Sequence, residues 1–207
     1  MKQDCKIIVF AKAPVPGFAK TRLIPALGAE AAGRLASRML SETVAQACAA
    51  QLGAVEICCA PDSSHAQFLS LQARHQIELS AQGEGDLGQR MWRAFERTLE
   101  SYHRVIIIGT DAPALHAEHL RLAARGLCEK DAVFAPAFDG GYVLVGLSRP
   151  LSSLFENIQW STAAVMQESR AQLLRAGASS FELPAFYDID EPADLAFVPP
   201  DWLASEI

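Results

Sequence analysis

The sequence lacks any apolar stretch long enough to cross a membrane. A spanning helix requires about 20 consecutive apolar residues, and charged residues interrupt every apolar run well before that length. The first such run, IIVFA, is stopped by Lys12 and Pro14 before it reaches the length of a signal peptide. We therefore expect a soluble, unprocessed protein with no membrane partner.

Positive charge is also scarce. Lysine and arginine together number 18, aspartate and glutamate number 24, and the net charge is −6. A surface of this sign repels nucleic-acid backbones, so we expect no nucleic-acid partner. Of the 207 residues, 50% are hydrophobic, which is enough for a sizeable core and favours a single domain over residues 1–207. The sequence predicts no oligomeric state.

The cysteine and histidine motifs of metal and redox sites are missing as well. The five cysteines are Cys5, Cys48, Cys58, Cys59 and Cys128. They form no C-x-x-C pair, and their odd number and apolar settings indicate reduced, mostly buried thiols and a cytoplasmic protein. His116 and His119 share an i, i+3 face, but no further motif completes a zinc set. No G-x-S-x-G elbow and no Cys/His signature identifies a nucleophile.

The sequence does contain a regular alternation of short apolar runs and amphipathic segments. Apolar, partly β-branched runs predict strands, and apolar residues at helical spacing predict the helices between them. The predicted strands cover 6–11, 54–60, 76–80, 104–110, 131–137, 141–147 and 179–183, and the predicted helices cover 29–51, 64–74, 87–99, 117–128 and 163–176. Strands that are apolar on both faces indicate a three-layer α/β/α sandwich with a mostly parallel sheet.

In such a sheet, ligands bind beyond the carboxyl ends of the strands. The loop after the first strand, AKAPVPGFAKTRL, places Lys12, Lys20 and Arg22 there. It is not a P-loop, because Pro14 and Ala19 stand where that motif requires glycine and proline has no N–H for phosphate. The three side chains can instead give charge-assisted hydrogen bonds to an anionic ligand. The alternative is a solvated basic loop.

The segment QGEGDLGQRM spells G-x-G-x-x-G at Gly83, Gly85 and Gly88. In a dinucleotide-binding fold these glycines follow the first strand, whereas here two strand-helix units precede them. We interpret the segment as a turn into a helix capped by Asp86, with Gly83 and Arg90 contacting a nucleotide. A NAD-type oxidoreductase using this loop remains the alternative.

The segment IIIGTDAP places Asp111 just beyond the end of a predicted central strand. A carboxylate there can hold Mg²⁺ or Mn²⁺, hard ions that take one or two protein carboxylates together with phosphate oxygens and water. The alternative is that Asp111 or Thr110 caps the following helix. The two roles are compatible.

Two further segments are candidates for substrate contacts. FDGGYVLVG predicts a tight hairpin in which Gly140 and Gly141 let the backbone approach a ligand and Asp139 contacts a hydroxyl, a cation or an acceptor. WST is interpreted first as a helix N-cap at Ser161 or Thr162, with a ligand contact by Trp160 and Ser161 as the second possibility.

The last candidate segment is YDIDEPADL. Asp188 and Asp190 are two residues apart, so an extended backbone points both carboxylates to one side. Clustered acids favour a cation, and Asp188 is the second predicted metal ligand. For Asp190, capping of the short helix entered at Pro192 is the preferred interpretation.

These six segments occur in an order that resembles the nucleotide-diphospho-sugar transferase superfamily with the glycosyltransferase-A fold. Within it, the chain looks like the bacterial branch of radical-SAM/selenodomain-associated transferases. The resemblance covers nearly the whole chain. It implies that Asp111 matches the metal-binding acid of the D-x-D-type site, with Gly109 replacing the first acid, and that Asp188 matches a late metal-binding position. It also implies that the loop with Lys20 and Arg22 is similar to a triphosphate-wrapping loop, although Pro14 and Pro16 depart from the glycine-rich signature.

Together these observations predict a divalent-metal-dependent transferase that uses a nucleoside triphosphate or a nucleotide-sugar and a small-molecule acceptor of unknown identity. Lys20 and Arg22, with Lys12 nearby, would neutralise charge on the departing pyrophosphate or nucleoside diphosphate. Glycosyl transfer would recruit Asp139 as well, whereas nucleotidyl transfer requires mainly positioning and charge stabilisation. A nucleotide-binding regulator without turnover is a further alternative.

Overall fold

The structure is a computed structural model and describes residues 2–203. Within them a seven-stranded sheet has the order β3-β2-β1-β4-β6-β5-β7. Its strands are β1 (Gln3–Lys12), β2 (Ala54–Ala60), β3 (Glu78–Ala81), β4 (Tyr102–Ile108), β5 (Ala132–Pro136), β6 (Tyr142–Leu147) and β7 (Ser180–Glu182). Only the pairings of β6 with β4 and β5 are antiparallel, which confirms the predicted hairpin in a mostly parallel sheet.

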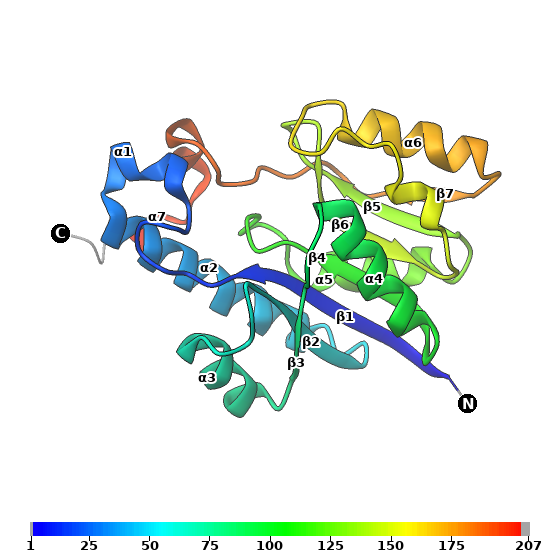
Figure 1. The fold of residues 1–207 in the computed structure, drawn as a ribbon, viewed down its shortest axis with the longest axis horizontal. Coiled ribbons are helices and arrows are strands. Elements are labelled where there is room, and N and C mark those ends of the chain that lie inside the picture. Colours follow the sequence, from blue (N-terminus) through cyan, green and yellow to red (C-terminus); the bar gives the residue numbers. More distant parts are fainter. Residues whose placement is uncertain (1, 204–207) are drawn as a thin grey trace.

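Helices cover both faces of the sheet, as Figure 1 shows. They are α1 (Ile24–Leu27), α2 (Ala29–Ala49), α3 (Ala66–His75), α4 (Leu87–Leu99), α5 (Ala117–Gly126), α6 (Val165–Arg175) and α7 (Pro200–Leu203), with 3-10 helices η1 (Thr21–Leu23), η2 (Ser152–Phe155) and η3 (Pro192–Phe197). The predicted alternation of strands and helices is confirmed. The short helix η1, which forms the end of the basic loop, and the short helix α1 after it were not predicted.

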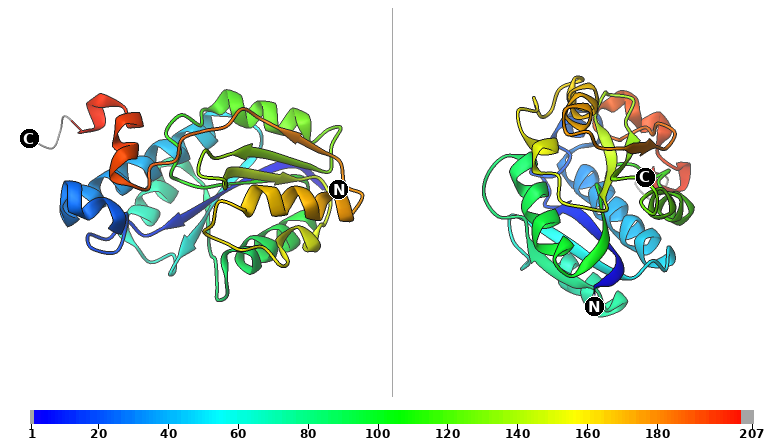
Figure 2. Two further views of the ribbon diagram at one scale, coloured as in Figure 1. Left: turned by 90° about the horizontal axis from the view of Figure 1, so that it is seen from above. Right: turned by 90° about the vertical axis from the view of Figure 1, so that its right-hand side faces the viewer.

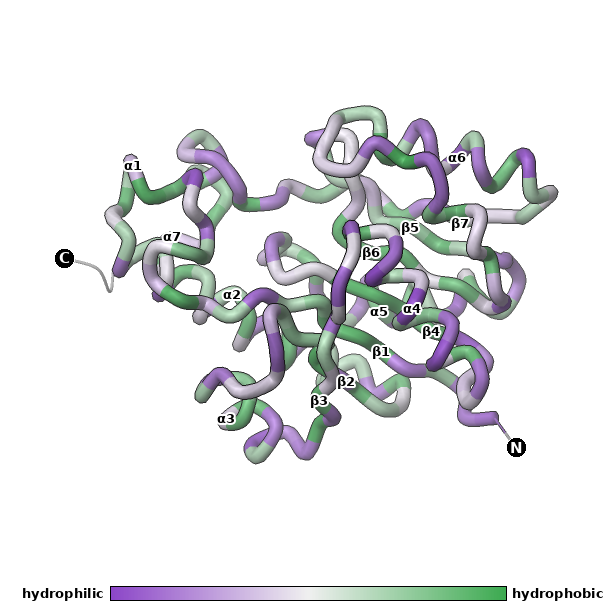
Figure 3. The backbone as a smooth tube through the Cα atoms, in the orientation of Figure 1, coloured by the Kyte–Doolittle hydropathy of each residue, from purple (hydrophilic) through white to green (hydrophobic). Residues whose placement is uncertain are grey.

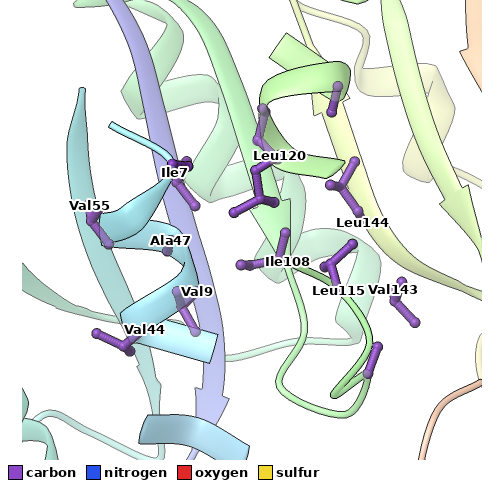
Figure 4. Packing of buried hydrophobic residues seen from close by; sticks show 14 of the residues in the cluster. Ile7, Val9, Val44, Ala47, Val55, Ile108, Leu115, Leu120, Val143 and Leu144 are labelled. Carbon is purple, nitrogen blue, oxygen red and sulfur yellow. The ribbon is translucent and has the colours of Figure 1, made fainter. Parts of the chain in front are cut away.

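The two faces of the sheet bury separate cores because successive strand side chains point to opposite sides. Ile7 and Val9 of β1 belong to the core under α2, α3 and α5, whereas Ile8 belongs to the core under α4, η2 and α6. Figure 4 shows the first core, with Val44 and Ala47 of α2 against β1. Apolar colouring in Figure 3 accordingly follows the central strands. This two-sided burial confirms the three-layer α/β/α sandwich.

A third cluster links the beginning and the end of the chain. Leu23 of η1, Met39 of α2, Ile189 and Val198 are buried together. To reach this cluster, the segment after β7 runs back along the molecule to η3 and α7, as Figure 2 shows from above. The packing therefore brings residues 188–190 beside the loop that follows β1.

The carboxyl ends of β1, β3, β4 and β5 lie at one edge of the sheet because these strands are parallel to one another. The antiparallel β6 begins at this edge. The loops that carry the predicted site residues therefore meet there. Across residues 2–203, no helix has the length and apolar character that crossing a bilayer requires.

Candidate functional site

Three connected pockets occupy this edge of the sheet, and Asp190 lines all three. The basic pocket, about 460 Å³, is lined by Lys12, Lys20, Arg22, Thr110, Asp111 and Asp190, among others. The central pocket, about 230 Å³, is lined by Asp111, Asp139, Gly141, Trp160, Ser161 and Asp188, among others. The aromatic pocket, about 330 Å³, is lined by Arg22, Phe138, Asp139, Tyr187, Asp188 and Glu191, among others. Shared lining residues show that the pockets form one branched cleft.

The Lys20 ammonium lies between two carboxylates in this cleft. Its Nζ is 2.7 Å from Asp111 Oδ1 and 2.8 Å from Asp190 Oδ1, and it also donates to the carbonyl of Ile189 at 2.5 Å. The Lys20 side chain is only 8% exposed. Burial alone would lower its pKa, but the charges of Asp111 and Asp190 outweigh burial and raise the pKa above its usual value. Lys20 is therefore a fixed cation paired with Asp190, the residue that lines all three pockets.

Main-chain contacts hold the two acidic segments together. The N–H of Ile189 donates to the carbonyl of Asp111 at 2.8 Å, so the late segment is bound to the loop after β4. Ile189 is fully buried, whereas Asp188 and Asp190 on either side of it line the cleft. This is the alternation predicted from their spacing. The prediction that Asp190 caps η3 is wrong, because the N-cap is Glu191 and Asp190 instead pairs with Lys20.

Asp188 lies in an environment with an excess of acid. Burial raises the pKa of its carboxyl, and the nearby charges of Asp139, Asp190 and Asp111 raise it further, to about 6. The Lys20 ammonium pairs with Asp111 and Asp190, whereas the charges that act most strongly on Asp188 are those of other carboxylates. A carboxylate in such a field is stabilised by any cation placed beside it.

Two acids of the cleft, Asp111 and Asp188, fit Mg²⁺ or Mn²⁺ only together with ligands from a substrate and water. Among residues 2–203, no three His, Cys, Asp or Glu side chains are grouped closely enough to hold a metal by themselves. Mg²⁺, however, is commonly bound by one or two carboxylates completed by substrate phosphate oxygens and water. Asp111 and Asp188 both line the central pocket and match that donor set. The alternative role of Asp111 or Thr110 as a helix cap is wrong, since the N-cap of α5 is His116.

The other two cations of the opening loop are more exposed than Lys20. Lys12 Nζ donates to the carbonyl of Phe18 at 3.0 Å, which closes the loop on itself. The Arg22 side chain is 65% exposed, lies 3.8 Å from the Glu191 carboxylate and lines both the basic and the aromatic pocket. The structure thus brings all three predicted cations to one wall of the cleft, and only Lys20 is buried.

The β5–β6 hairpin supplies the opposite wall. Asp139 Oδ1 accepts the N–H of Gly141 at 2.7 Å, which orients its carboxylate beside Asp188 in the central pocket. Gly140 does not line the three pockets. Its φ is +93°, and an added Cβ would lie 2.2 Å from the carbonyl oxygen of Ala163, so glycine is required by packing.

Trp160 and Ser161 line the central pocket, as their predicted contact role requires. The capping prediction for this segment is wrong in detail, because the N-cap of α6 is Ala164, although Thr162 Oγ1 accepts the N–H of Ala164 at 3.3 Å. Trp160 also packs on Gly88, where an added Cβ would lie 2.7 Å from the indole ring. The third glycine of the G-x-G-x-x-G pattern thus serves packing.

The rest of that pattern forms a turn into α4. Asp86 caps the helix by accepting the N–H of Gln89 at 2.8 Å, as predicted. Arg90 donates to Gln82 Oε1 at 2.9 Å and to the carbonyl of Asp86. Neither Arg90 nor Gly83 lines the three pockets, and Gly83 has a φ of +75° with the Arg93 guanidinium beside it. Arg90 and Gly83 therefore have structural roles in the turn.

Several residues of the cleft were not predicted from the sequence. Leu87 and Tyr142 line both the basic and the central pocket, and Phe138 and Tyr187 line the aromatic pocket. Apolar residues at the ends of strands and helices look like core residues in a sequence. Phe138 and Tyr187 each stand next to a predicted acidic site residue, Asp139 and Asp188. This adjacency is the sequence feature that could have identified them as cleft residues.

Comparisons with known proteins agree with this fold. A family model described as "Uncharacterized protein conserved in bacteria (DUF2064)" matches residues 43–162. A "putative nucleotide-diphospho-sugar transferase" from Desulfovibrio desulfuricans G20 is 30% identical, with a TM-score of 0.87 over 96% of this chain and 87% of that chain. No curated protein matches the sequence.

More distant structures share the fold alone. A CMP:2-keto-3-deoxy-manno-octonic acid synthetase solved with CTP is 12% identical, with a TM-score of 0.58 over 99% of this chain and 100% of that chain. A Mycobacterium tuberculosis H37Rv protein solved with manganese is 12% identical, with a TM-score of 0.53 over 95% and 98% of the two chains. The sheet and its helices match those of the Desulfovibrio desulfuricans structure named as a "putative nucleotide-diphospho-sugar transferase".

Proposed function

The chain belongs to the DUF2064 family, and we propose that its cleft binds a nucleoside triphosphate or a nucleotide-sugar and transfers a nucleotidyl or glycosyl group to a small-molecule acceptor. The observation that carries this proposal is the buried Lys20 ammonium between Asp111 and Asp190, with Lys12 and Arg22 on the same wall. We propose that residues 1–207 form one transferase domain of this kind. Membership of the radical-SAM/selenodomain-associated branch stays a prediction from sequence.

Each side chain has a role in the proposed reaction. Lys20 and Arg22, helped by Lys12, bind donor phosphates and neutralise the charge that develops on the departing pyrophosphate or nucleoside diphosphate. Asp111 and Asp188 would hold Mg²⁺ or Mn²⁺, which supplies further neutralisation of phosphate charge when bound. Trp160, Ser161 and Gly141 line the place where the acceptor approaches, and Asp139 can take a proton from an acceptor hydroxyl.

Two donor classes have separate support. The similar synthetase was solved with CTP, a nucleoside triphosphate, which favours nucleotidyl transfer. The protein with 30% identity is named for nucleotide-diphospho-sugars, which favours a nucleotide-sugar donor. Both donors present a diphosphate to the basic pocket, so the same cations serve either reaction. The released product separates them, because nucleotidyl transfer releases pyrophosphate and glycosyl transfer from a nucleoside diphosphate-sugar releases a nucleoside diphosphate.

A thermal-shift panel tests the proposal. Nucleoside triphosphates and nucleotide-sugars are added with and without Mg²⁺ or Mn²⁺, and hits proceed to product analysis. A bound donor raises the melting temperature because it binds only the native state. We expect this rise to depend on the metal ion in the wild type and to be lost in Asp111→Asn. The matched control is Asp62→Asn, an exposed loop residue outside the three pockets.

Three outcomes would count against the proposal. An Asp111→Asn response equal to that of Asp62→Asn would remove Asp111 from the site. Donor binding without any product from a range of acceptors would support the alternative of a nucleotide-binding regulator. Stabilisation by NAD that Gly85→Ala abolishes would support the oxidoreductase alternative, although the three glycines serve turns and packing in this structure.

A further inference from the structure

The aromatic pocket is bordered by a stack of three exposed rings. The Tyr187 ring lies 3.6 Å from the Phe197 ring, centroid to centroid, with an interplanar angle of 9°, and 4.3 Å from the Phe138 ring. The three side chains come from η3, the segment after β7 and the β5–β6 hairpin. The N–H of Phe138 donates to the carbonyl of Phe186, so the hairpin and the late segment are joined beneath the rings.

All three rings are exposed to solvent although they contact one another. Phe138 is 60% exposed, Tyr187 is 42% exposed and Phe197 is 45% exposed. Single exposed apolar side chains are ordinary, but a contiguous exposed patch beside a cavity marks a binding surface. Phe138 is the most exposed of the three and lines the aromatic pocket directly. Its ring is therefore available to a ligand in that pocket.

The charge around Phe138 is strongly negative. Five acidic residues line the aromatic pocket, namely Asp139, Asp188, Asp190, Glu191 and Asp194, against the single basic residue Arg22. Arg22 approaches Glu191 at 3.8 Å, and Lys20 pairs with Asp190 from the other side. Asp194 accepts the N–H groups of Asp190 and Glu191. At neutral pH the acids still outnumber the cations that reach them.

A phosphate-bearing ligand does not suit this pocket because it would face like charge. A cation fits this pocket for two reasons. The carboxylates attract the cation, and the negative face of an aromatic ring binds the cation as well. A neutral ligand gains only the ring contact. The cleft thus separates ligands by charge: the basic pocket favours the anionic donor, and the aromatic pocket favours an occupant of the opposite sign.

We propose that the aromatic pocket, with the exposed ring of Phe138 beside Asp139 and Glu191, binds the ammonium-bearing part of a small-molecule acceptor. The inference rests on the proposed transferase function, because it assigns the acceptor to the part of the cleft that the donor leaves open. An ammonium group packed on Phe138 lies next to the central pocket, which shares Asp139, Asp188 and Asp190 with the aromatic pocket. The acceptor is therefore an amine or a quaternary ammonium compound.

Two probes of equal shape test the charge preference. Choline carries a trimethylammonium group, and 3,3-dimethyl-1-butanol carries a neutral tert-butyl group in its place. Binding of each to the full chain is measured by ligand-observed NMR titration, without nucleotide or divalent ion. We expect choline to bind about tenfold more tightly than the neutral alcohol, given the strength of partly desolvated cation–π contacts. Equal binding of the two probes, or no binding of choline to the folded wild type, would overturn the proposal.

A pair of variants locates the probe. Phe138→Leu keeps an apolar side chain but removes the ring, and we expect it to weaken choline binding about tenfold. Phe138→Tyr keeps the ring and should bind choline as the wild type does. Unchanged choline affinity in folded Phe138→Leu would place the probe elsewhere. If Phe138→Leu does not fold, the comparison of the two probes on the wild type still decides.

The two proposals can fail separately. Donor binding is measured in the same variants by thermal shift with nucleotide and Mg²⁺, and Phe138→Leu should respond as the wild type does. Choline binding without any donor binding would leave the aromatic pocket supported and the proposed function wrong. Donor binding without choline binding would support the proposed function and overturn the inference about the acceptor.

Discussion

Two lysines of the first strand and its loop each bridge a pair of carboxylates, at opposite ends of the sheet. Lys6, near the beginning of β1, lies 2.8 Å from Glu56 and 2.8 Å from Glu78. Lys20, after the end of β1, lies 2.7 Å from Asp111 and 2.8 Å from Asp190. The local geometry of the two bridges is nearly the same, but their surroundings differ.

The cluster around Lys6 balances its own charge. Arg97 of α4 donates to both carboxylate oxygens of Glu56, and Ser80 donates to one of them. Burial acts to raise the pKa of Glu56, but hydrogen bonds from Arg97, Lys6 and Ser80 outweigh it and lower the pKa to about 2. Two cations thus satisfy the buried Glu56 together with the half-exposed Glu78.

The cluster around Lys20 does not balance its charge. Its acids include Asp188 and Asp139 in addition to the two that Lys20 bridges, and the pKa of Asp188 rises to about 6. The contrast shows that a buried ion pair by itself does not indicate function. We infer that the pairs around Lys6 hold the fold together, whereas the excess acid near Lys20 is available for a ligand cation.

Glu56→Gln should produce the largest effect and would sharpen this contrast. It leaves the buried Lys6 ammonium with only the exposed Glu78 carboxylate as its counter-charge, so we expect a loss of about 3–5 kcal/mol in the free energy of unfolding. Urea denaturation at pH 7 measures it. The control Glu78→Gln, whose side chain is 59% exposed, should cost less than about 1 kcal/mol.

The pH dependence of the same variant follows from the sign of the shift. The folded pKa of Glu56, about 2, lies below its usual value of 4.5, so its contribution is complete above pH 4.5 and is lost as the pH falls towards 2. The difference in the free energy of unfolding between wild type and Glu56→Gln should therefore shrink as the pH falls from 4.5 towards 2. A difference that stays constant with pH would contradict the lowered pKa of Glu56.

Lys20→Met should have the next largest effect, and on activity. Methionine keeps much of the side-chain length but removes the ammonium that we assign to the donor phosphates, so we expect a fall of about 100- to 1,000-fold in kcat/KM. Product formation with the best donor from the panel measures it. The control is Lys130→Met, an exposed lysine outside the three pockets. Equal activity of the two variants would contradict the functional role that we assign to the Lys20 cluster.

Asp188→Asn should have the smallest effect, on stability. The folded pKa of Asp188, about 6, lies above its usual value of 3.8, so the wild type loses stability as the pH rises from about 3.8 through 6. Asparagine does not ionise, and we expect it to stabilise the metal-free protein by about 1 kcal/mol at pH 8, after allowance for solvent screening. Thermal unfolding at pH 5 and pH 8 tests this. Parallel pH profiles for variant and wild type would show that Asp188 is not surrounded by excess acid.

Most elements of the fold were predictable because their signals are local. The strand expected at 54–60 spans Ala54–Ala60, and the cap expected at Asp86 is present. Caps at Asp190 and Ser161 were wrong because a short polar side chain in a loop has many competing partners. Arg90 was expected to contact the ligand. In the structure its guanidinium donates to Gln82 at the base of the turn.

The alternation of strands and helices, and the position of the basic loop and the acidic segments after parts of one sheet, can be predicted from the sequence because apolar periodicity and strand order are encoded residue by residue. The position of Lys20 between Asp111 and Asp190, in contrast, depends on how distant segments pack. Asp190 is 170 residues away along the chain, and its position depends on the buried packing of Ile189 against η1 and α2. The excess of acid beside Phe138 arises from that same packing, since charges add up in space and not along the sequence.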